Sequence, residues 1–511
     1  MCPCSPPPPP HPHHPLRSHP VTFRQTGLNT GSHDLPVSAA LNAFMGTSWA
    51  ATPLPAEDRV PGYAVTPGRR SRLSAAFPGE RLIVPAGQLK VRSNDVDYRF
   101  RPHSAYAWLT GLTGEDQVGH VLVLEPTGPD GHEPVLYLRP RSPRGGDPVR
   151  GAEFFRDRRY GEFWVGRRPD LDEAARLTGV RVEHLDELDK LLTGPQPATR
   201  VLTGVDPALD GATNRPGAPE LVQGDGLFAA VLSELRLVKD AWEVEQLQLS
   251  VDHTVLGFED VVRALPTALR HHRGERWIEG VFNLRARAEG NGIGYETIAA
   301  TGAHACVLHW IRNDGALDPN ALLLLDAGVE TDTLYTADIT RTLPLSGTFT
   351  PVQRQAYELV LAAQQAGIDA LRPGARFRDF HSAAARVIAE GLADWGILPV
   401  SAEEALADDS GLYRRYTLCG TGHMLGLDVH DCARARAETY LDGVLEEGHV
   451  LTVEPGLYLQ PDDETLPAEL RGLGIRIEDD LVITADGARL MSGALPRTVP
   501  AIEAWMADLL G

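Results

Sequence analysis

Two histidines stand seven residues apart in the glycine-rich stretch 419-CGTGHMLGLDVHD-431, as His423 and His430. Cys419 precedes the first histidine by four residues, and two aspartates flank the second. Histidine and carboxylate side chains both bind divalent cations and transfer protons, so the stretch is compatible with a metal site or a catalytic site. An isolated histidine is more often an ordinary core or surface residue, so this stretch alone establishes neither a metal site nor a catalytic site.

Four carboxylates stand inside or beside apolar runs elsewhere in the C-terminal half of the chain. A carboxylate in such a place is costly unless it is paired or bound to a metal. Two of them could face each other across a hairpin, and the other two stand near turns of later strands. In chain order they are Asp326, Asp338, Glu454 and Glu478.

Each of these carboxylates alone also has an ordinary structural explanation. Asp326 could cap a turn, Asp338 could lie at a strand edge, and Glu454 could belong to a surface turn. Strand alternation puts Arg476 and Glu478 on one face, where they could form an exposed ion pair.

Together with His423, the four carboxylates form an oxygen-rich set with one imidazole that could neutralise two divalent cations. Hard oxygen ligands favour Mn²⁺, Mg²⁺ or Fe²⁺, and a single imidazole leaves Zn²⁺ or Co²⁺ open. No cysteine belongs to the set, which disfavours a structural zinc site. Two such metals roughly 3.5–4 Å apart can deprotonate a bridging water, and the resulting hydroxide can attack a carbonyl at neutral pH.

The elements that must position these residues alternate between helices and hairpin-like strands, which predicts an α+β domain over residues 234–511. Apolar periodicity and strand-like runs define the individual elements. Helices are predicted over 234–265, 275–289, 351–371 and 377–393, and strands over 295–301, 321–328, 335–345, 448–459 and 474–484.

The preceding part of the chain predicts a smaller α/β domain over residues 81–233, after a lead-in over 45–80. Residues 1–44 are rich in proline and histidine, and we expect them to form a disordered tail. Met45 offers an alternative start, and translation from it would leave this tail out of the protein.

Composition narrows the function classes. The 511 residues carry a formal net charge of −21, which disfavours a nucleic-acid partner and an anionic membrane surface. The longest apolar runs are much shorter than the roughly 18 to 20 residues of a membrane helix. Five sparse cysteines do not suggest a disulfide framework, so we expect a reducing, cytoplasmic location.

The residues above, in their order along the chain, resemble the pita-bread metallopeptidases. The stretch 92-RSNDVDYRFRPHSAYAWLTGL-112 is also similar to the N-terminal domain of aminopeptidase P, which extends the resemblance to about residue 81. The resemblance implies a pita-bread catalytic domain behind a smaller domain of the creatinase and aminopeptidase P type. It is carried by the motifs LLLLDAG, ADITRTLP, GTGHMLGLDVHD, TVEPGLY and GIRIEDD.

The resemblance implies a role for each candidate metal ligand. Asp338 and Glu478 would bridge two divalent ions, most readily Mn²⁺, with Zn²⁺, Co²⁺ or Fe²⁺ as alternatives. His423 and Glu454 would hold one ion, and Asp326 would hold the other.

Further roles follow from the same resemblance. His309 and His430 would hydrogen-bond substrate carbonyls and the oxyanion of the transition state, and Glu454 would also shuttle a proton. These three residues are the catalytic candidates. Arg476 and Tyr458 are the candidates for substrate binding, and Arg476 could instead support a metal ligand.

Within this family, the large N-terminal domain and the complete ligand set favour aminopeptidase P, which removes a residue that precedes proline. A specialist is needed because the imide nitrogen of an Xaa-Pro bond has no hydrogen and the ring fixes the backbone. The alternatives are an Xaa-Pro dipeptidase (prolidase) and a non-catalytic binding protein that reuses the fold.

The expected partners are peptides with proline at the second position and further copies of the chain. The resemblance implies a homo-oligomer, a dimer or a tetramer, in which a neighbouring N-terminal domain narrows the site. Asp95 and Asn94 are the candidates for that contact.

The sequence departs from the family pattern at two points. Asp326 and Asp338 are 12 residues apart, one more than in well-known members, and a longer turn over 329–335 would absorb the difference. Cys419 stands where many members have a histidine. Cysteine is smaller and a weaker hydrogen-bond donor, so we expect metal binding to persist and the handling of substrate beyond proline to change.

Overall fold

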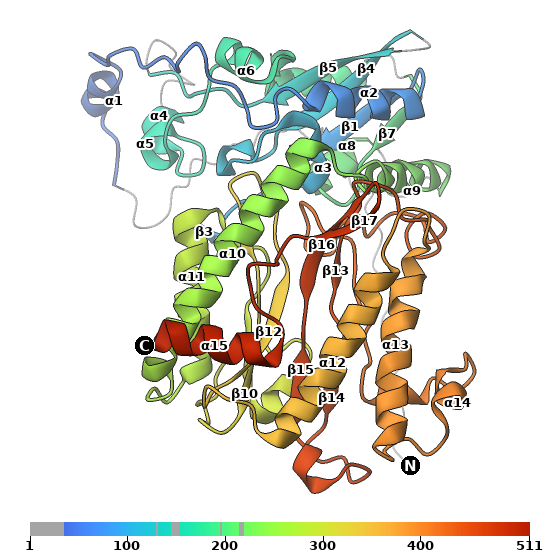
Figure 1. Ribbon diagram of the computed structural model, residues 1–511. Coiled ribbons are helices and arrows are strands. Elements are labelled where there is room, and N and C mark those ends of the chain that lie inside the picture. The colour runs from blue at the N-terminus through green and yellow to red at the C-terminus, as the bar shows by residue number, and fades with distance from the viewer. Residues whose placement is uncertain (1–34, 129–130, 145–152, 195–196, 214–218) are drawn as a thin grey trace, which may run out of the picture.

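The chain forms two layered parts, which the computed structural model in Figure 1 shows one above the other. Residues 1–34, the greater part of the predicted tail, lie outside the described residues, and helix α1 occupies residues Ala39–Met45. The structure describes residues 35–128, 131–144, 153–194, 197–213 and 219–511.

A five-stranded sheet in the order β6-β5-β4-β1-β7 organises the N-terminal part. Its inner strand β1 is buried along its whole length, as its apolar run Leu82–Val84 requires. The sheet is mixed, because β4 pairs antiparallel with β1 and β5 while the outer strands β6 and β7 run parallel to their neighbours. The strands are β1 (Arg81–Pro85), β4 (Val121–Gly128), β5 (Gly131–Leu138), β6 (Arg181–His184) and β7 (Thr199–Val201), with the separate hairpin β2 (Val91–Ser93) and β3 (Val96–Asp97). The helices are α2 (Thr66–Ala76), α3 (Ser104–Thr110), α4 (Glu153–Arg156), α5 (Glu162–Val165), α6 (Leu171–Thr178), α7 (Leu188–Thr193), α8 (Pro207–Ala212) and α9 (Pro219–Glu234).

Small antiparallel sheets form the centre of the C-terminal part, and long helices pack in pairs around them (Figure 1). α10 packs against α11, and α12 packs against α13. The helices are α10 (Ala241–Ala268), α11 (Gly274–Glu289), α12 (Pro351–Ala370), α13 (Phe377–Asp394), α14 (Ala402–Leu406) and α15 (Val499–Leu510). The strands are β8 (Gly292–Ile293), β9 (Ile298–Thr301), β10 (Leu322–Ala327), β11 (Val329–Glu330), β12 (Ile339–Pro344), β13 (Val450–Val453), β14 (Gly456–Leu459), β15 (Leu473–Arg476), β16 (Asp479–Thr484) and β17 (Gly487–Leu490).

The predicted helix over 234–265 is wrong at its start. α9 ends at Glu234, and α10 begins only at Ala241, after the cap residue Asp240. The Asp240 side chain accepts a hydrogen bond from the backbone nitrogen of Glu243, and the Glu243 side chain accepts one from the backbone nitrogen of Asp240. This reciprocal capping satisfies amide groups that the first turn leaves free, so it sets the helix start.

Each of the two C-terminal strands predicted over 448–459 and 474–484 is in fact two strands. β13 pairs with β16, whereas β14 pairs with β15, so the chain changes sheets in the middle of each predicted strand. Glu454 and Glu478 lie at these two changes of sheet. The fold therefore brings the two glutamates to neighbouring strand ends.

Among the described residues, no helix is both long enough and apolar enough to span a membrane.

Candidate active site

A cavity of about 530 Å³ in the C-terminal part brings together all the predicted site residues of that part. It is formed by the ends of the small sheets and by the loops that carry the histidines. Its lining includes Asp326, Asp338, His423, Glu454, Glu478, His309, His430, Arg476, Tyr458 and Cys419.

The hairpin of β10 and β12 positions the two aspartates. Asp326 lies in β10 opposite Thr340 of β12, and Asp338 directly precedes β12. Between the strands, a Cβ atom on Gly328 would lie 1.8 Å from the carbonyl oxygen of Ala337, so only glycine allows this close approach. Both aspartates are buried, so neither is an ordinary exposed polar residue.

His423 is fixed by the backbone around it. Its amide nitrogen donates to Thr452 Oγ1 at 3.1 Å, and its ring Nδ1 lies 3.2 Å from the carbonyl oxygen of Met424. With Nδ1 engaged, Nε2 faces the carboxylates, 3.2 Å from Asp338 Oδ2 and 3.5 Å from Glu454 Oε1. The loop approaches β13 closely, because a Cβ atom on Gly422 would lie 2.1 Å from the Thr452 carbonyl oxygen.

Glu478 is the most confined of the carboxylates, at 1% exposure. Its Oε2 accepts a hydrogen bond from Thr340 Oγ1 at 2.7 Å. Its Oε1 is buried and has no hydrogen-bond partner among the described residues. A buried carboxylate oxygen without a partner is costly, so this atom is suited to binding a cation.

The crowded carboxylates of the cavity make it suitable for binding divalent cations. Burial and the nearby charge of Asp338 raise the pKa of Glu478 well above its usual value. Although burial lowers it, the hydrogen bond with Asp338 and the charge of Glu454 raise the pKa of His423 to about 9. One ligand atom from each of Asp338, His423 and Glu478 lies within 4.8 Å of the others. In the protein alone, protons must offset the crowded negative charge, and a bound cation would do so directly.

Arg476 also lines the cavity and is buried, at 4% exposure. Its Nη2 donates to Asp326 Oδ2 at 2.5 Å, and its Nη1 donates to Tyr458 Oη at 2.9 Å. Its Nε donates to Thr340 Oγ1 at 3.1 Å. The predicted alternative of an exposed ion pair with Glu478 is therefore wrong, because both residues are buried and the guanidinium pairs with Asp326.

The histidines and the cysteine line the more open side of the cavity. His309, His430 and Cys419 are all exposed, whereas the metal-ligand candidates are buried or half-buried. The ring of His430 meets that of His423 edge-on, with 4.4 Å between centroids. Although the residue is exposed overall, partial desolvation of its ring and the charge of His423 lower the pKa of His430, so its neutral form is favoured. A neutral imidazole can still donate one hydrogen bond to a substrate oxygen.

Three residues of the site were not predicted from the sequence. Tyr295 donates from its hydroxyl to Asp326 Oδ1 at 2.6 Å, and Thr340 supports both Glu478 and Arg476. Asp480 Oδ2 accepts from the backbone nitrogen of Asp338 at 3.1 Å. The one available signal was the acidic doublet after Glu478, since charged residues inside an apolar strand indicate buried partners.

The two aspartates that flank His430, Asp428 and Asp431, have structural contacts. Asp431 is buried and accepts hydrogen bonds from Arg236 and from Lys239 Nζ, the latter at 2.8 Å. Asp428 pairs with Arg236 at 2.8 Å. Neither aspartate lines the active-site cavity, so they hold the histidine loop against the segment before α10.

Asn94 and Asp95 lie apart from this cavity, at the turn between β2 and β3. Asp95 Oδ2 is 3.7 Å from Arg158 Nη1. Their expected contact with a neighbouring subunit stays a prediction.

Two protein families account for most of the chain. The family described as metallopeptidase family M24 matches residues 252–485, and the aminopeptidase P N-terminal domain matches residues 67–198. These matches and the solved structures below confirm the predicted α+β fold, a pita-bread catalytic domain behind a smaller α/β domain. A metallopeptidase family implies divalent metal ions, which agrees with the geometry of the cavity.

Individual relatives cover nearly the whole chain. Xaa-Pro aminopeptidase 1 of Streptomyces coelicolor is 50% identical over 492 residues, which are 96% of each chain. Aminopeptidase PepP of Pseudomonas aeruginosa superposes with a TM-score of 0.74 at 30% identity, covering 88% of this chain and 99% of that one. Aminopeptidase P of Escherichia coli, solved with the inhibitor Pro-Leu, gives a TM-score of 0.73 at 29% identity, covering 88% and 98%. The chain therefore belongs to the Xaa-Pro aminopeptidases of metallopeptidase family M24, and is a hydrolase.

Proposed function

We propose that this chain removes the first residue from peptides whose second residue is proline, with a pair of divalent metal ions held in the cavity described above. The observation that carries the proposal is the convergence of four carboxylates and one imidazole on one cavity. The Oε1 atom of Glu478, which has no hydrogen-bond partner in the described part of the chain, adds support, since a bound cation would satisfy it. The proposed ligands are Asp326, Asp338, His423, Glu454 and Glu478.

Asp338 and Glu478 are the proposed bridging ligands, with His423 and Glu454 on one ion and Asp326 on the other. The carboxylate-rich set favours Mn²⁺, and its single imidazole leaves Zn²⁺, Co²⁺ or Fe²⁺ as alternatives. When bound, such a pair polarises a substrate carbonyl and lowers the pKa of a water molecule.

The protein groups around this pair move the proton and bind the substrate oxygens. The nitrogen of an Xaa-Pro bond must gain a proton before it can leave, because it carries no hydrogen of its own. Glu454 borders the cavity, and burial and the charge of Asp338 raise its pKa to about 7 although His423 lowers it. We assign to its carboxylate the transfer of the proton from the attacking water to that nitrogen.

His309 and His430 are proposed to donate hydrogen bonds to the carbonyl oxygen as it becomes negative. Both line the open side of the cavity, where a peptide can enter. Donors aimed at a developing oxyanion stabilise the transition state more than the ground state. Tyr458 and Arg476 line the cavity but are buried, and the guanidinium is engaged by Asp326 and Tyr458, so we assign them to support of the site rather than to contact with a long peptide.

Peptide length separates the proposed activity from that of a dipeptidase. We expect the chain to hydrolyse both Xaa-Pro-Yaa peptides and longer ones, because the cavity of about 530 Å³ opens beside exposed residues. The dependence on peptide length is measured by chromatography of the alanine released from Ala-Pro, Ala-Pro-Ala and Ala-Pro-Ala-Ala. Cleavage of Ala-Pro alone would contradict the proposal, and a matched Ala-Ala-Ala peptide controls for the need for proline.

Replacing Cys419 by histidine is expected to raise kcat/KM for tripeptides and longer peptides several-fold, with metal content unchanged. An imidazole donates a stronger hydrogen bond than a thiol, and one hydrogen bond to substrate is worth about 1 kcal/mol. Cys419 lines the cavity but is exposed, and it is not one of the five proposed metal ligands. Kinetics on the peptides above and metal analysis check the prediction.

Cys419→Ala is the matched control, since it removes the thiol without adding a donor. The assignment of Cys419 to the substrate side would be refuted if Cys419→His altered metal content, or if all three proteins cleaved long peptides equally well.

We also propose that the chain forms a homo-oligomer, a dimer or a tetramer, in which Asn94 and Asp95 of one subunit approach the site of the next. Their exposed position at the turn between β2 and β3 supports such a contact. A cytoplasmic location is proposed because Cys306, Cys419 and Cys432 are free thiols. Light scattering of the purified protein measures the oligomeric state.

A further inference from the structure

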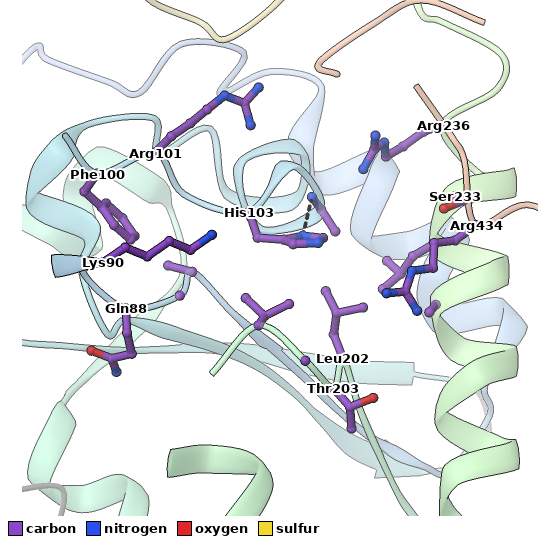
Figure 2. A pocket seen from close by; sticks show the side chains of 17 residues that line it. Gln88, Lys90, Phe100, Arg101, His103, Leu202, Thr203, Ser233, Arg236 and Arg434 are labelled. Carbon is purple, nitrogen blue, oxygen red and sulfur yellow. Dashed lines mark hydrogen bonds between the residues drawn. The ribbon is translucent and has the colours of Figure 1, made fainter. Parts of the chain in front are cut away.

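A second cavity, of about 270 Å³, lies between the N-terminal and C-terminal parts and shares no lining residue with the active-site cavity. Figure 2 shows the side chains that line it. Lys90 comes from the segment before β2, whereas Arg434 comes from the loop that follows His430. Both parts of the chain therefore contribute to this cavity, which we call the interdomain cavity.

The interdomain cavity is strongly cationic, although the whole chain carries a net charge of −21. Among the described residues, no aspartate or glutamate lines it. Its four cationic lining residues are Lys90, Arg101, Arg236 and Arg434.

Two of these four cations are already neutralised. Arg101 Nε pairs with Glu330 Oε2 at 2.7 Å, and Arg236 Nη2 pairs with Asp428 Oδ2 at 2.8 Å. Lys90 and Arg434, by contrast, form no ion pair or side-chain hydrogen bond within the described part of the chain. In Figure 2 they extend into the cavity from opposite sides. Both side chains are exposed to solvent, and their charges make the cavity positive, which would attract an anion.

His103 lies between Lys90 and Arg434 in Figure 2 and adds a neutral donor. Its Nδ1 accepts a hydrogen bond from the Ala105 amide at 3.2 Å, so the neutral ring carries its proton on Nε2. Burial and the charge of Arg236 lower the pKa of His103 to about 4, so the ring is neutral at pH 7.

Arg236 and Ser233 add further hydrogen-bond donors on the side of the cavity where Arg434 lies (Figure 2). Arg236 is 5% exposed, and its Nε is buried without a hydrogen-bond partner among the described residues. Ser233 brings a hydroxyl from the end of α9. Leu202, Val205 and Leu232 supply apolar wall beside these donors. The cavity thus offers charged donors at one place and apolar surface next to it, as sites for organic anions do.

We propose that the interdomain cavity binds a small phosphate-bearing anion between Lys90 and Arg434, with His103 Nε2 as a third donor. Donors that approach from different directions suit the tetrahedral oxygens of a phosphate better than the planar oxygens of a carboxylate. A volume of about 270 Å³ accommodates free orthophosphate and also a phosphomonoester whose organic part lies against the leucines. This proposal is independent of the peptidase activity, because the two cavities share no residue.

Calorimetric titration of the metal-loaded protein with orthophosphate, phenyl phosphate and benzoate tests the proposal. We expect saturable binding of at least one of the two phosphates, weaker binding of benzoate, and loss of affinity as ionic strength rises. Stronger binding of phenyl phosphate would identify a phosphomonoester as the source, and stronger binding of orthophosphate would identify the free ion.

Lys90→Gln and Arg434→Gln should each weaken phosphate binding about tenfold or more, because each removes one charge-assisted hydrogen bond. Neither variant should change kcat/KM for Ala-Pro-Ala. Arg92→Gln is the matched control, since this exposed arginine lies two residues from Lys90 and does not line the cavity. Phosphate binding that is absent, or that persists unchanged in both variants, for example at the metal ions, would overturn the proposal, as would equal affinity for benzoate.

Discussion

Replacing Asp338 by alanine is expected to reduce kcat/KM for Ala-Pro-Ala by about 10³-fold or more. Asp338 Oδ2 lies 3.2 Å from His423 Nε2, and one ligand atom of each lies within 4.8 Å of a carboxylate oxygen of Glu478. Because Asp338 is a proposed bridging ligand, its loss would leave both metal ions short of a ligand. Steady-state kinetics with metal analysis of the same preparation measure the effect.

The same substitution at Glu478 should give the same loss. Unlike Asp338, Glu478 has a buried carboxylate oxygen, Oε1, without a hydrogen-bond partner among the described residues. Removing that oxygen therefore breaks no hydrogen bond that it makes within the described residues, and its main expected effect is on metal binding. Asp338→Asn keeps the shape of the side chain, and it separates loss of the ligand charge from loss of packing.

Asp462→Ala is the matched control, because this aspartate is exposed and outside the cavity. Circular dichroism and the melting temperature show whether each variant is folded. Near-normal activity in a folded Asp338→Ala or Glu478→Ala protein would refute the assignment of bridging ligands.

Replacing Arg476 by lysine is expected to weaken metal binding by about 10–100-fold and to lower kcat/KM with it. Arg476 holds Asp326 at 2.5 Å, Tyr458 at 2.9 Å and Thr340 at 3.1 Å from three different nitrogens. Lysine keeps the positive charge but has a single nitrogen, so it cannot reproduce this planar fork. Metal titration followed by activity measures the affinity.

Arg415→Lys provides the control for this arginine. Arg415 makes a two-point contact with Asp463, at 2.8 Å from both Nε and Nη2, away from the cavity. We expect that variant to bind metal normally. If Arg476→Lys also did so, the guanidinium would not orient Asp326 for metal binding.

The positions of the candidate ligands were accessible from the sequence because buried charge is conspicuous there. Asp326 interrupts an apolar strand, and Glu454 directly follows another. A carboxylate in such a place needs an ion-pair partner or a bound metal, so the sequence alone indicates a functional site there. The order of the motifs along the chain then supplied the family.

Sheet pairing and long-range contacts were not accessible in the same way. The runs 448–459 and 474–484 each read as one strand, because local residue preferences do not encode where a chain changes sheets. The predicted start of α10 is wrong because the segment from Glu234 to Asp240 contains neither proline nor glycine, the residues that usually indicate a break between two helices.

The surroundings of the ligands also depended on contacts between distant residues. Tyr295 and Asp326 are 31 residues apart, and Arg476 and Asp326 are 150 apart. Alternation along one strand predicts that Arg476 and Glu478 share a face, and both do line the cavity, but it gives no indication that the ion-pair partner of Arg476 is Asp326. Such pairs become visible only when the hairpin of β10 and β12 packs against β15.

Anomalous scattering from crystals of the protein grown with Mn²⁺ tests the central claim most directly. Two peaks per chain are expected in the cavity, with Asp338 and Glu478 between them, His423 and Glu454 at one peak, and Asp326 at the other. Activity on Ala-Pro-Ala should rise with Mn²⁺ until about two ions are bound per chain. A single peak, a pair of peaks elsewhere, or an active protein without bound metal would contradict the account.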